Sequence, residues 1–348
     1  MRTARPALFL LLALPLVLVV SLRAQTTSLQ ATGPYRWVLT DLGRLPSEEV
    51  VALAQDELEN RYFATRKGLT VEDKSDNYHI YTRSNTRGAL TSDSLTCIGI
   101  DRYRDVWIGT DGGGLNVFSG GNWKAYTREN TRGGLPDDGV LALALHKEVR
   151  WVGTRNGFAA LRGGSWTTYT GSQISGRLPH PSVTAIAVDS SGDVWLGTLG
   201  GLVRLSGSVW TRYNRENTEN GMPHNGITSL YVDPRNGLWV GTQTGLARRA
   251  PNGTWVVFNA TSGLRDLAQQ RVVSITQGMD GDVWASFRGG AARFTGGVWE
   301  LYTRENVPGL LTLYVNYVLA GPNGVARIAT QKGVISRLPA SVVVSGEE

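Results

Sequence analysis

The sequence predicts an all-β fold in which seven four-stranded units follow one another and close into a ring. Three observations predict it: a motif that recurs at a nearly constant spacing, four short strands within each unit, and a composition rich in turn residues and tryptophan. Gly accounts for 43 of the 348 residues and Trp for 11, and both shares are high for a chain of this length. Such a composition favours short strands joined by tight turns.

The repeated motif is Trp-x-Gly-Thr. Four full copies begin at Trp107, Trp151, Trp195 and Trp239, and three weaker copies begin at Tyr62, Trp284 and Arg327. Successive copies start 45, 44, 44, 44, 45 and 43 residues apart. Four strands in about 44 residues is the period of one propeller blade, so the seven copies predict a seven-bladed β-propeller.

Each unit divides into four strands, and the third copy shows them most clearly. Residues 140–145 form an apolar run suited to a buried inner strand, and residues 150–154, 157–162 and 165–170 supply the next three. The Asp-rich turns, such as residues 189–193, favour hairpin turns, with a calcium site as the alternative. All eleven Trp occupy repeat positions, so we expect them to pack between blades.

The two ends of the repeat region predict how the ring closes. Residues 36–40 resemble the fourth strand of a blade, whereas residues 313–338 supply only the first three strands of one. An unclosed ring would leave two sheet edges exposed. We therefore expect residues 36–40 to complete the last blade of a domain at residues 31–340, followed by a short tail at residues 341–348.

Residues 1–24 have the character of a secretory signal peptide. Arg2 and Arg5 precede an apolar run at residues 7–22, and residues 22–24 form the expected cleavage site, with an uncleaved membrane anchor as the alternative. Cleavage removes three Arg and no acid, which lowers the formal charge from +6 to +3. So weak a charge argues against nucleic-acid binding. We expect a periplasmic or extracellular protein that meets a membrane only through an uncleaved N-terminus.

Few residue patterns point to catalysis. The chain has four His and one cysteine, Cys97, which excludes an internal disulfide and which we expect to be buried. Neither a metal-binding spacing nor a Gly-x-Ser-x-Gly elbow is present. We therefore predict a protein that is not an enzyme and has no catalytic residue, no metal and no cofactor.

The linkers between blades supply the candidate ligand-binding residues. In a propeller each linker runs from an outermost strand to the next innermost strand on one face, around the central channel, and loops on a rigid scaffold commonly carry function. The candidates at the ends of the linkers are Glu48, Asp93, Asp138, His180, His224, Asn225, Gln270, Arg271 and Tyr314. The alternative is that they are ordinary solvated loop residues. Duplication of the repeat is the favoured explanation for finding His180 and His224 at equivalent positions, and metal binding or acid–base catalysis is the alternative.

A second repeated sequence, Arg-Glu-Asn, follows three outer strands. It begins at Arg128, Arg215 and Arg304. Because it repeats, we expect a structural turn with a local ion pair.

The blade pattern resembles the two-component regulator propeller repeat. The resemblance rests on Leu178-Pro179, the buried run at residues 183–188, the turn at Asp189 and Gly192, residues 195–198, and Gly201-Leu202. In that family such propellers commonly form the sensing part of hybrid histidine kinases, where a further β-domain, a membrane span and a kinase follow. This sequence ends at Glu348 without them, so the resemblance implies a free-standing binding protein, acting with or without a separate kinase.

Three functions therefore compete. The favoured one is a noncatalytic exported propeller for binding, sensing or protein interaction, whose partner is a small polar ligand, a saccharide or another exported protein. The second is a polysaccharide lyase or glycosidase at the central channel, which would need paired carboxylates among Glu48, Asp93 and Asp138. The third is a structural module of the cell envelope, which an apolar patch on the outer rim would support.

Overall fold

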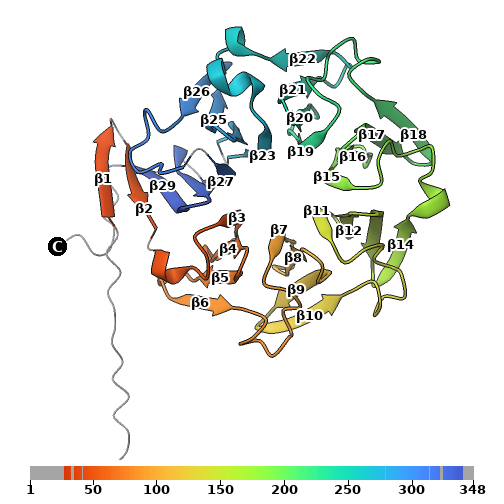
Figure 1. Cartoon of the computed structure of the whole chain (residues 1–348), viewed down its shortest axis with the longest axis horizontal. Helices are drawn as coiled ribbons and strands as arrows, with labels where there is room; N and C mark the ends of the chain where they lie inside the picture. Colours follow the sequence, from red (N-terminus) through yellow and green to blue (C-terminus); the bar gives the residue numbers. More distant parts are fainter. Residues whose placement is uncertain are drawn as a thin grey trace, which may run out of the picture.

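The computed structural model describes residues 27–32, 35–40, 42–278, 280–312, 314–321 and 324–339. The predicted signal peptide and the predicted tail at residues 341–348 lie outside these ranges. Seven antiparallel sheets surround a central opening, so the described chain forms the predicted seven-bladed β-propeller (Figure 1).

Six blades have four strands each, in sequence order from the channel outward. Blade 1 contains β3 (Val50–Gln55), β4 (Arg61–Thr65), β5 (Gly68–Glu72) and β6 (Tyr78–Tyr81). Blade 2 contains β7 (Leu95–Ile100), β8 (Val106–Thr110), β9 (Leu115–Ser119) and β10 (Asn122–Tyr126). Blade 3 contains β11 (Val140–His146), β12 (Val149–Thr154), β13 (Gly157–Arg162) and β14 (Ser165–Tyr169).

Blades 4 to 6 repeat this arrangement. Blade 4 contains β15 (Val183–Val188), β16 (Val194–Thr198), β17 (Gly201–Ser206) and β18 (Val209–Tyr213). Blade 5 contains β19 (Ile227–Val232), β20 (Leu238–Thr242), β21 (Gly245–Arg249) and β22 (Trp255–Phe258). Blade 6 contains β23 (Val272–Gln277), β24 (Val283–Phe287), β25 (Gly290–Thr295) and β26 (Val298–Tyr302).

Blade 7 joins the two ends of the described chain. β27 (Val315–Ala320), β28 (Ala326–Thr330) and β29 (Gly333–Pro339) are followed in the sheet by β2 (Tyr35–Leu39), with Trp37 opposite Arg337. The predicted closure is therefore confirmed. The sheet also has a fifth, outermost strand, β1 (Thr27–Thr32), which pairs with β2. The sequence did not predict β1, because its residues lack the aromatic marker of the blade strands.

Four short helical turns lie in the linkers. These 3-10 helices are η1 (Leu42–Arg44) before blade 1, η2 (Gly171–Gln173) before blade 4, and η3 (Ala260–Ser262) with η4 (Arg265–Gln269) before blade 6. Within the same ranges, no helix is long and apolar enough to cross a bilayer.

The Asp-rich turns are closed by their own hydrogen bonds. In blade 4, Asp189 Oδ1 accepts from the backbone N–H groups of Ser191 and Asp193, and Asp189 Oδ2 accepts from the Trp195 indole N–H at 3.1 Å. The same set of bonds is made in blade 2 by Asp101 and in blade 5 by Asp233. In blade 1 it is made by Asp56, with the Tyr62 hydroxyl as donor in place of a Trp indole. Both carboxylate oxygens thus have protein donors, which favours the hairpin-turn interpretation over a calcium site.

The motif tryptophans pack as the sequence predicts. Trp107 stacks on Tyr126 of its own blade at 6.2 Å, and Tyr126 meets the edge of Trp166 in the next blade at 5.5 Å. At the closure, Trp37 meets Tyr302 of blade 6 at 5.7 Å. Aromatic pairs therefore join blades around the ring.

The Arg-Glu-Asn turns are held by the amide and not by an ion pair. Asn130 Oδ1 accepts from the Thr127 N–H at 2.8 Å, and Asn130 Nδ2 donates to the Ala125 carbonyl at 3.0 Å. Asn217 and Asn306 do the same in their blades. The predicted turn is confirmed, but none of these turns has an Arg–Glu ion pair within the described ranges.

Candidate functional site

A narrow channel runs along the axis of the ring. Its volume is about 340 Å³, and its wall is formed by the seven inner strands. Each inner strand has a β-bulge near its start, because its pairing with the second strand of the blade skips one residue. The skipped residues all line the channel, and they are Val51, Thr96, Leu141, Thr184, Thr228, Val273 and Asn316.

Polar bulge residues also connect neighbouring blades. The Oγ1 atoms of Thr96 and Thr184 donate to carbonyl groups of the next blade at 2.7 Å, and Asn316 Nδ2 donates to the Val50 carbonyl at 2.8 Å. The hydroxyl of Thr228 is buried and has no hydrogen-bond partner in the described chain. Bulges commonly redirect a side chain out of the ladder. Here they direct one residue per blade toward the channel.

Three of the predicted site residues stabilise the linkers. The side-chain oxygens of Asp93, Asp138 and Asn225 each accept a backbone N–H at the start of the preceding turn, from Arg83, Arg128 and Arg215 at 2.5 to 2.6 Å. These side chains occupy equivalent positions in three linkers and do the same work. One oxygen of each is therefore committed to the fold.

His180 and His224 also make equivalent structural bonds. His180 Nδ1 accepts the Ser182 N–H at 3.0 Å, and His224 Nδ1 accepts the Gly226 N–H at 2.8 Å. Asp137 makes this bond in its own linker, so the position favours any short acceptor. The bond fixes the neutral tautomer that carries its proton on Nε2.

The remaining predicted residues lie at the channel mouth or beside it. Glu48 pairs with Lys332 at 3.0 Å across the junction of blades 1 and 7. Gln270 and Arg271 lie just before β23, and the Tyr314 side chain is 41% exposed just before β27. Burial, together with the charge of Arg288, holds the pKa of Arg271 below its ordinary value.

The hairpins between the second and third strands supply mouth residues that the sequence reasoning missed. Each hairpin begins with the residue after the Trp-x-Gly-Thr motif, and in five blades the N–H of this residue donates to the chain just before the inner strand. The seven residues are Arg66, Asp111, Arg155, Leu199, Gln243, Arg288 and Gln331. A signal was available in the sequence, since this position varies directly beside a motif that repeats.

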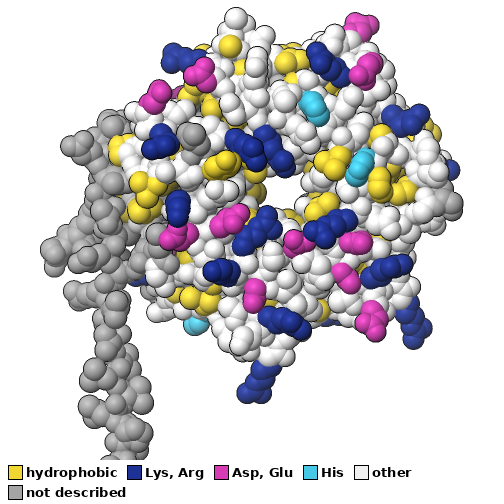
Figure 2. Space-filling model, viewed as in Figure 1, with side chains coloured by type: hydrophobic (Ala, Val, Ile, Leu, Met, Phe, Trp, Pro, Cys, Tyr) yellow, Lys and Arg dark blue, Asp and Glu magenta, His cyan; other side chains and the backbone are white. Residues whose placement is uncertain are grey.

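Most charges at the mouth are paired. Arg66 lies 3.7 Å from Glu49, Arg155 pairs with Asp111 of the neighbouring blade, and Lys332 pairs with Glu48. Arg271 and Arg288 form no ion pair within the described ranges. Figure 2 shows Lys and Arg side chains around the opening, including a group over the inner part of blade 6. Lys67 of blade 1 also has no ion pair within these ranges, so blade 6 differs in bringing two unpaired cations to one place.

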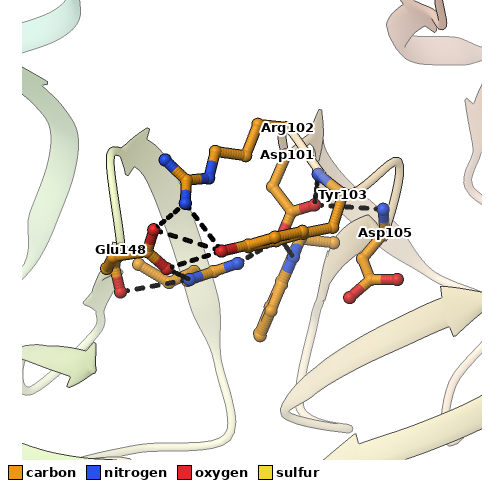
Figure 3. Close-up of polar contacts among 7 residues, drawn as sticks. Asp101, Arg102, Tyr103, Asp105 and Glu148 are labelled. Atoms are coloured by element: carbon orange, nitrogen blue, oxygen red, sulfur yellow. Dashed lines mark hydrogen bonds and ion pairs between the residues drawn. The ribbon is translucent and has the colours of Figure 1, made fainter. Parts of the chain in front are cut away.

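The first turns of blades 2 and 3 carry a different charged cluster, which connects the two blades (Figure 3). Arg150 of blade 3 pairs with Asp101 of blade 2, and Tyr103 donates to Glu148 at 3.1 Å. Arg102 also pairs with Glu148. Arg102 and Arg150 each form an ion pair with a carboxylate, so the cluster acts as a connection between blades.

Metal and thiol chemistry find little support in the described residues. Among them, no group of three or more His, Cys, Asp or Glu side chains is arranged to hold a metal ion. Cys97 is a free thiol on β7, and burial raises its pKa to about 11. It packs against Gly109, but the residue is only partly buried and lines the channel, so the full burial that the sequence predicts is not observed.

The class of protein follows from this architecture: the chain is a seven-bladed β-propeller with a polar channel. Residues 177–200 and 221–244, which contain the linkers and first two strands of blades 4 and 5, match the two component regulator propeller family. The predicted resemblance to that propeller repeat is thus confirmed in blades 4 and 5. No curated protein sequence matches it.

Solved structures with this fold have varied roles. The extracellular domain of the hybrid two component system BT3049 from B. thetaiotaomicron is 21% identical, with a TM-score of 0.74 over 87% of this chain. This chain spans only 42% of that domain. Virginiamycin B lyase from Staphylococcus aureus, in an inactive form with quinupristin, is 14% identical, with a TM-score of 0.67 over 90% of this chain and 99% of the lyase.

A third similar structure is YCF48 bound to D1 peptide. It is 14% identical, with a TM-score of 0.61 over 91% of this chain and 98% of YCF48. At such identities the likeness shows a shared fold and leaves function to the site.

Proposed function

We propose that this protein is an exported, noncatalytic propeller that binds a ligand or a protein partner on the face that carries the channel mouth. One observation carries the proposal. Most polar groups of this face are committed to structural bonds, whereas the cations of blade 6 are not. Charged groups that the fold leaves unpaired beside a concave opening are available to a partner.

The same bonds argue against catalysis. A lyase or glycosidase would use a pair of carboxylates, or a His beside a carboxylate, to move protons. The carboxylates of Asp93 and Asp138 each accept a hydrogen bond from a backbone N–H, and Glu48 forms an ion pair with Lys332. The Nδ1 atoms of His180 and His224 accept backbone N–H groups of their own linkers. Each group therefore has a structural role that acid–base work would disturb.

An exported location is supported by the predicted signal peptide and by the extracellular origin of the BT3049 domain. The structural-module hypothesis has less support. The exposed Val209, Val256 and Val298 lie on outer strands of three different blades, and apolar residues exposed singly are normal on protein surfaces.

The test is a thermal-melting screen of the purified protein against saccharides, peptides and divalent metal ions. A ligand at 100 times its Kd should add about 2.7 kcal/mol to the free energy of unfolding. Val273→Phe, which places a ring in the channel, should reduce binding at least tenfold. Val209→Phe on the outer rim is the matched control and should leave binding unchanged.

Two outcomes would contradict the proposal. Equal binding by Val273→Phe and the wild-type protein would move the site off the channel face. Turnover of any ligand, followed in the same samples by chromatography, would show that the protein is an enzyme.

A further inference from the structure

A second cavity lies on the outer side of the ring, between blades 4 and 5. Its volume is about 630 Å³, within the range of about 300–1,000 Å³ that is usual for small-molecule sites. The linker between the two blades lines it with residues 217–221, and the outer strands line it with Tyr213 of β18, Arg249 of β21, and Trp255 and Val257 of β22. None of its lining residues belongs to the channel.

The residue at the position of Arg249 differs from blade to blade. On each third strand it pairs with the residue just before the Trp-x-Gly-Thr motif, and in four blades it is apolar: Phe118, Leu161, Leu205 and Phe294. In blade 1, Glu72 forms an ion pair with Arg61, and in blade 7, Arg337 donates to the Gly324 carbonyl. Arg249 has no ion pair within the described ranges, and its Nε atom is buried without a hydrogen-bond acceptor.

The guanidinium group of Arg249 is held between two aromatic rings at the wall of the cavity. Its carbon lies 5.5 Å from the ring centre of Trp195 and 5.5 Å from that of Tyr213. Its Nη2 atom lies beside Gly253, which lines the cavity, since a Cβ atom on that glycine would be 3.3 Å away. A partly buried cation without an acceptor is unfavourable, because burial removes the water that would solvate it. A carboxylate in the cavity would offset this cost, since guanidinium groups bind carboxylates strongly.

Glu219 brings a negative charge to the same cavity. Its side chain is exposed and forms no ion pair within the described ranges, with Arg249 or with any other residue. Of the described residues that line the cavity, Arg249 is the one cation and Glu219 the one anion. A simple anion would be repelled by Glu219, whereas a ligand with one positive and one negative group can meet both charges.

The rest of the wall includes an apolar surface. The rings of Tyr213 and Trp255 meet edge to face with their centres 6.2 Å apart, and both residues are partly exposed, as is Val257. Aromatic rings of this kind bury the apolar part of a ligand. The cavity therefore offers a cation, an anion and an aromatic surface, which match the two charged ends and the side chain of an apolar amino acid.

We infer that the cavity between blades 4 and 5 binds a zwitterion of the amino-acid type. Its carboxylate lies on Arg249, its ammonium group on Glu219 and its apolar side chain against Trp255. The inference goes beyond the proposed function, because this cavity and the channel are separate. The same chemistry occurs in a free amino acid and in a short peptide with free ends.

Isothermal titration calorimetry tests the inference with L-phenylalanine and the dipeptide phenylalanyl-alanine. Each probe is also used with its amino group acetylated and with its carboxyl group amidated, which removes one charge at a time. We expect an unblocked probe to bind at least tenfold more tightly than either of its blocked forms. Tighter binding of the dipeptide identifies a short peptide as the source, whereas equal or tighter binding of phenylalanine identifies a free amino acid.

Two variants assign the charges to their residues. Arg249→Leu should remove the preference for a free carboxylate, and it is compatible with the fold because Leu occupies this position in blades 3 and 4. Glu219→Gln should remove the preference for a free amino group. Arg212→Leu on β18 and Glu216→Gln in the same linker are the matched controls, since neither residue lines the cavity. Both controls should change affinity less than twofold, and thermal melting establishes that all four variants fold.

Three results would overturn the inference. They are the absence of binding by both unblocked probes, equal binding of blocked and unblocked forms, and a preference that survives the matching substitution. The Val273→Phe variant separates this cavity from the channel, and it should leave zwitterion binding unchanged. Loss of binding in Val273→Phe would place the ligand in the channel, which supports the proposed function and contradicts the inference.

Discussion

Replacing Asp101 by Asn should destabilise the connection between blades 2 and 3. The carboxylate accepts the N–H groups of Tyr103 and Asp105 through Oδ1, and the Trp107 indole N–H at 3.0 Å through Oδ2, which also pairs with Arg150 (Figure 3). An Asn side chain keeps one accepting oxygen for the turn. Its amide nitrogen cannot accept from Trp107 or pair with Arg150.

The magnitude follows from burial. The Arg150 side chain is only 11% exposed and would keep only its longer ion pair with Glu148, at 3.9 Å. Loss of the partner of a buried charge costs about 3–5 kcal/mol, and the remaining pair places the cost here near the lower value. The unsatisfied indole adds a hydrogen-bond penalty of about 1–3 kcal/mol, which overlaps with the first cost. We therefore expect a loss of about 4 kcal/mol and, in a chain of this size, a fall in Tm of about 8 °C.

Thermal and urea melting, followed by tryptophan fluorescence, measure this change. Asp105→Asn is the matched control, because it removes the same charge from the same turn, and the Asp105 carboxylate forms no ion pair with any residue that the structure describes. It should shift stability by less than about 0.5 kcal/mol. Equal losses in the two variants would refute the reasoning, since net charge would then explain both.

Three further predictions concern the closure, acid stability and the thiol. Trp37→Ala removes a side chain that is 3% exposed and contacts Tyr302, and should cost about 3–5 kcal/mol in urea melting; an unchanged midpoint would contradict the closure. Burial opposes ionisation of Asp101 and Asp233, but hydrogen bonds from Arg150 and Arg248 outweigh it and hold both pKa values below the ordinary one. The stability that these two ionised carboxylates contribute should persist at neutral pH and be lost below about pH 4. A plot of Tm against pH should show this loss, and the loss should be smaller in the Asp101→Asn variant. Burial raises the pKa of the channel-lining Cys97 thiol to about 11, so little thiolate is present at neutral pH and iodoacetamide should label it much more slowly than free cysteine; labelling at the rate of free cysteine would contradict this.

The sequence was sufficient to predict the fold because each blade repeats its own signals. The Trp-x-Gly-Thr motif marks the second strand of each blade, and the orphan strand at residues 36–40 indicated the closure that β2 makes. β1 was missed because it pairs through its main chain and carries no aromatic marker. The inner-strand bulges were missed because an extra residue in an apolar run does not alter the hydrophobic pattern.

The candidate site was harder to predict, because the same residue type can serve the fold or a ligand. Asp138 and His224 vary between blades in a way that suggested binding, yet both accept backbone N–H groups. Arg271 was identified from its linker, but its neighbour Arg288 was not, because the two are brought together only when strands pair. Whether a charge has a partner depends on such long-range contacts, so no local pattern reveals it.

The pairing of β2 with β29 has a consequence for how the protein reaches its folded state. Trp37 lies opposite Arg337, 300 residues further along the chain. Contacts between residues so distant in sequence form slowly, because the intervening chain must lose its freedom first. While the chain is being synthesised, β2 can pair only with β1, so blade 7 cannot form until nearly the whole described chain is available. Blades 1 to 6 each consist of consecutive strands and need no distant partner, so the closing of the ring is the one step of folding that waits for the last strands.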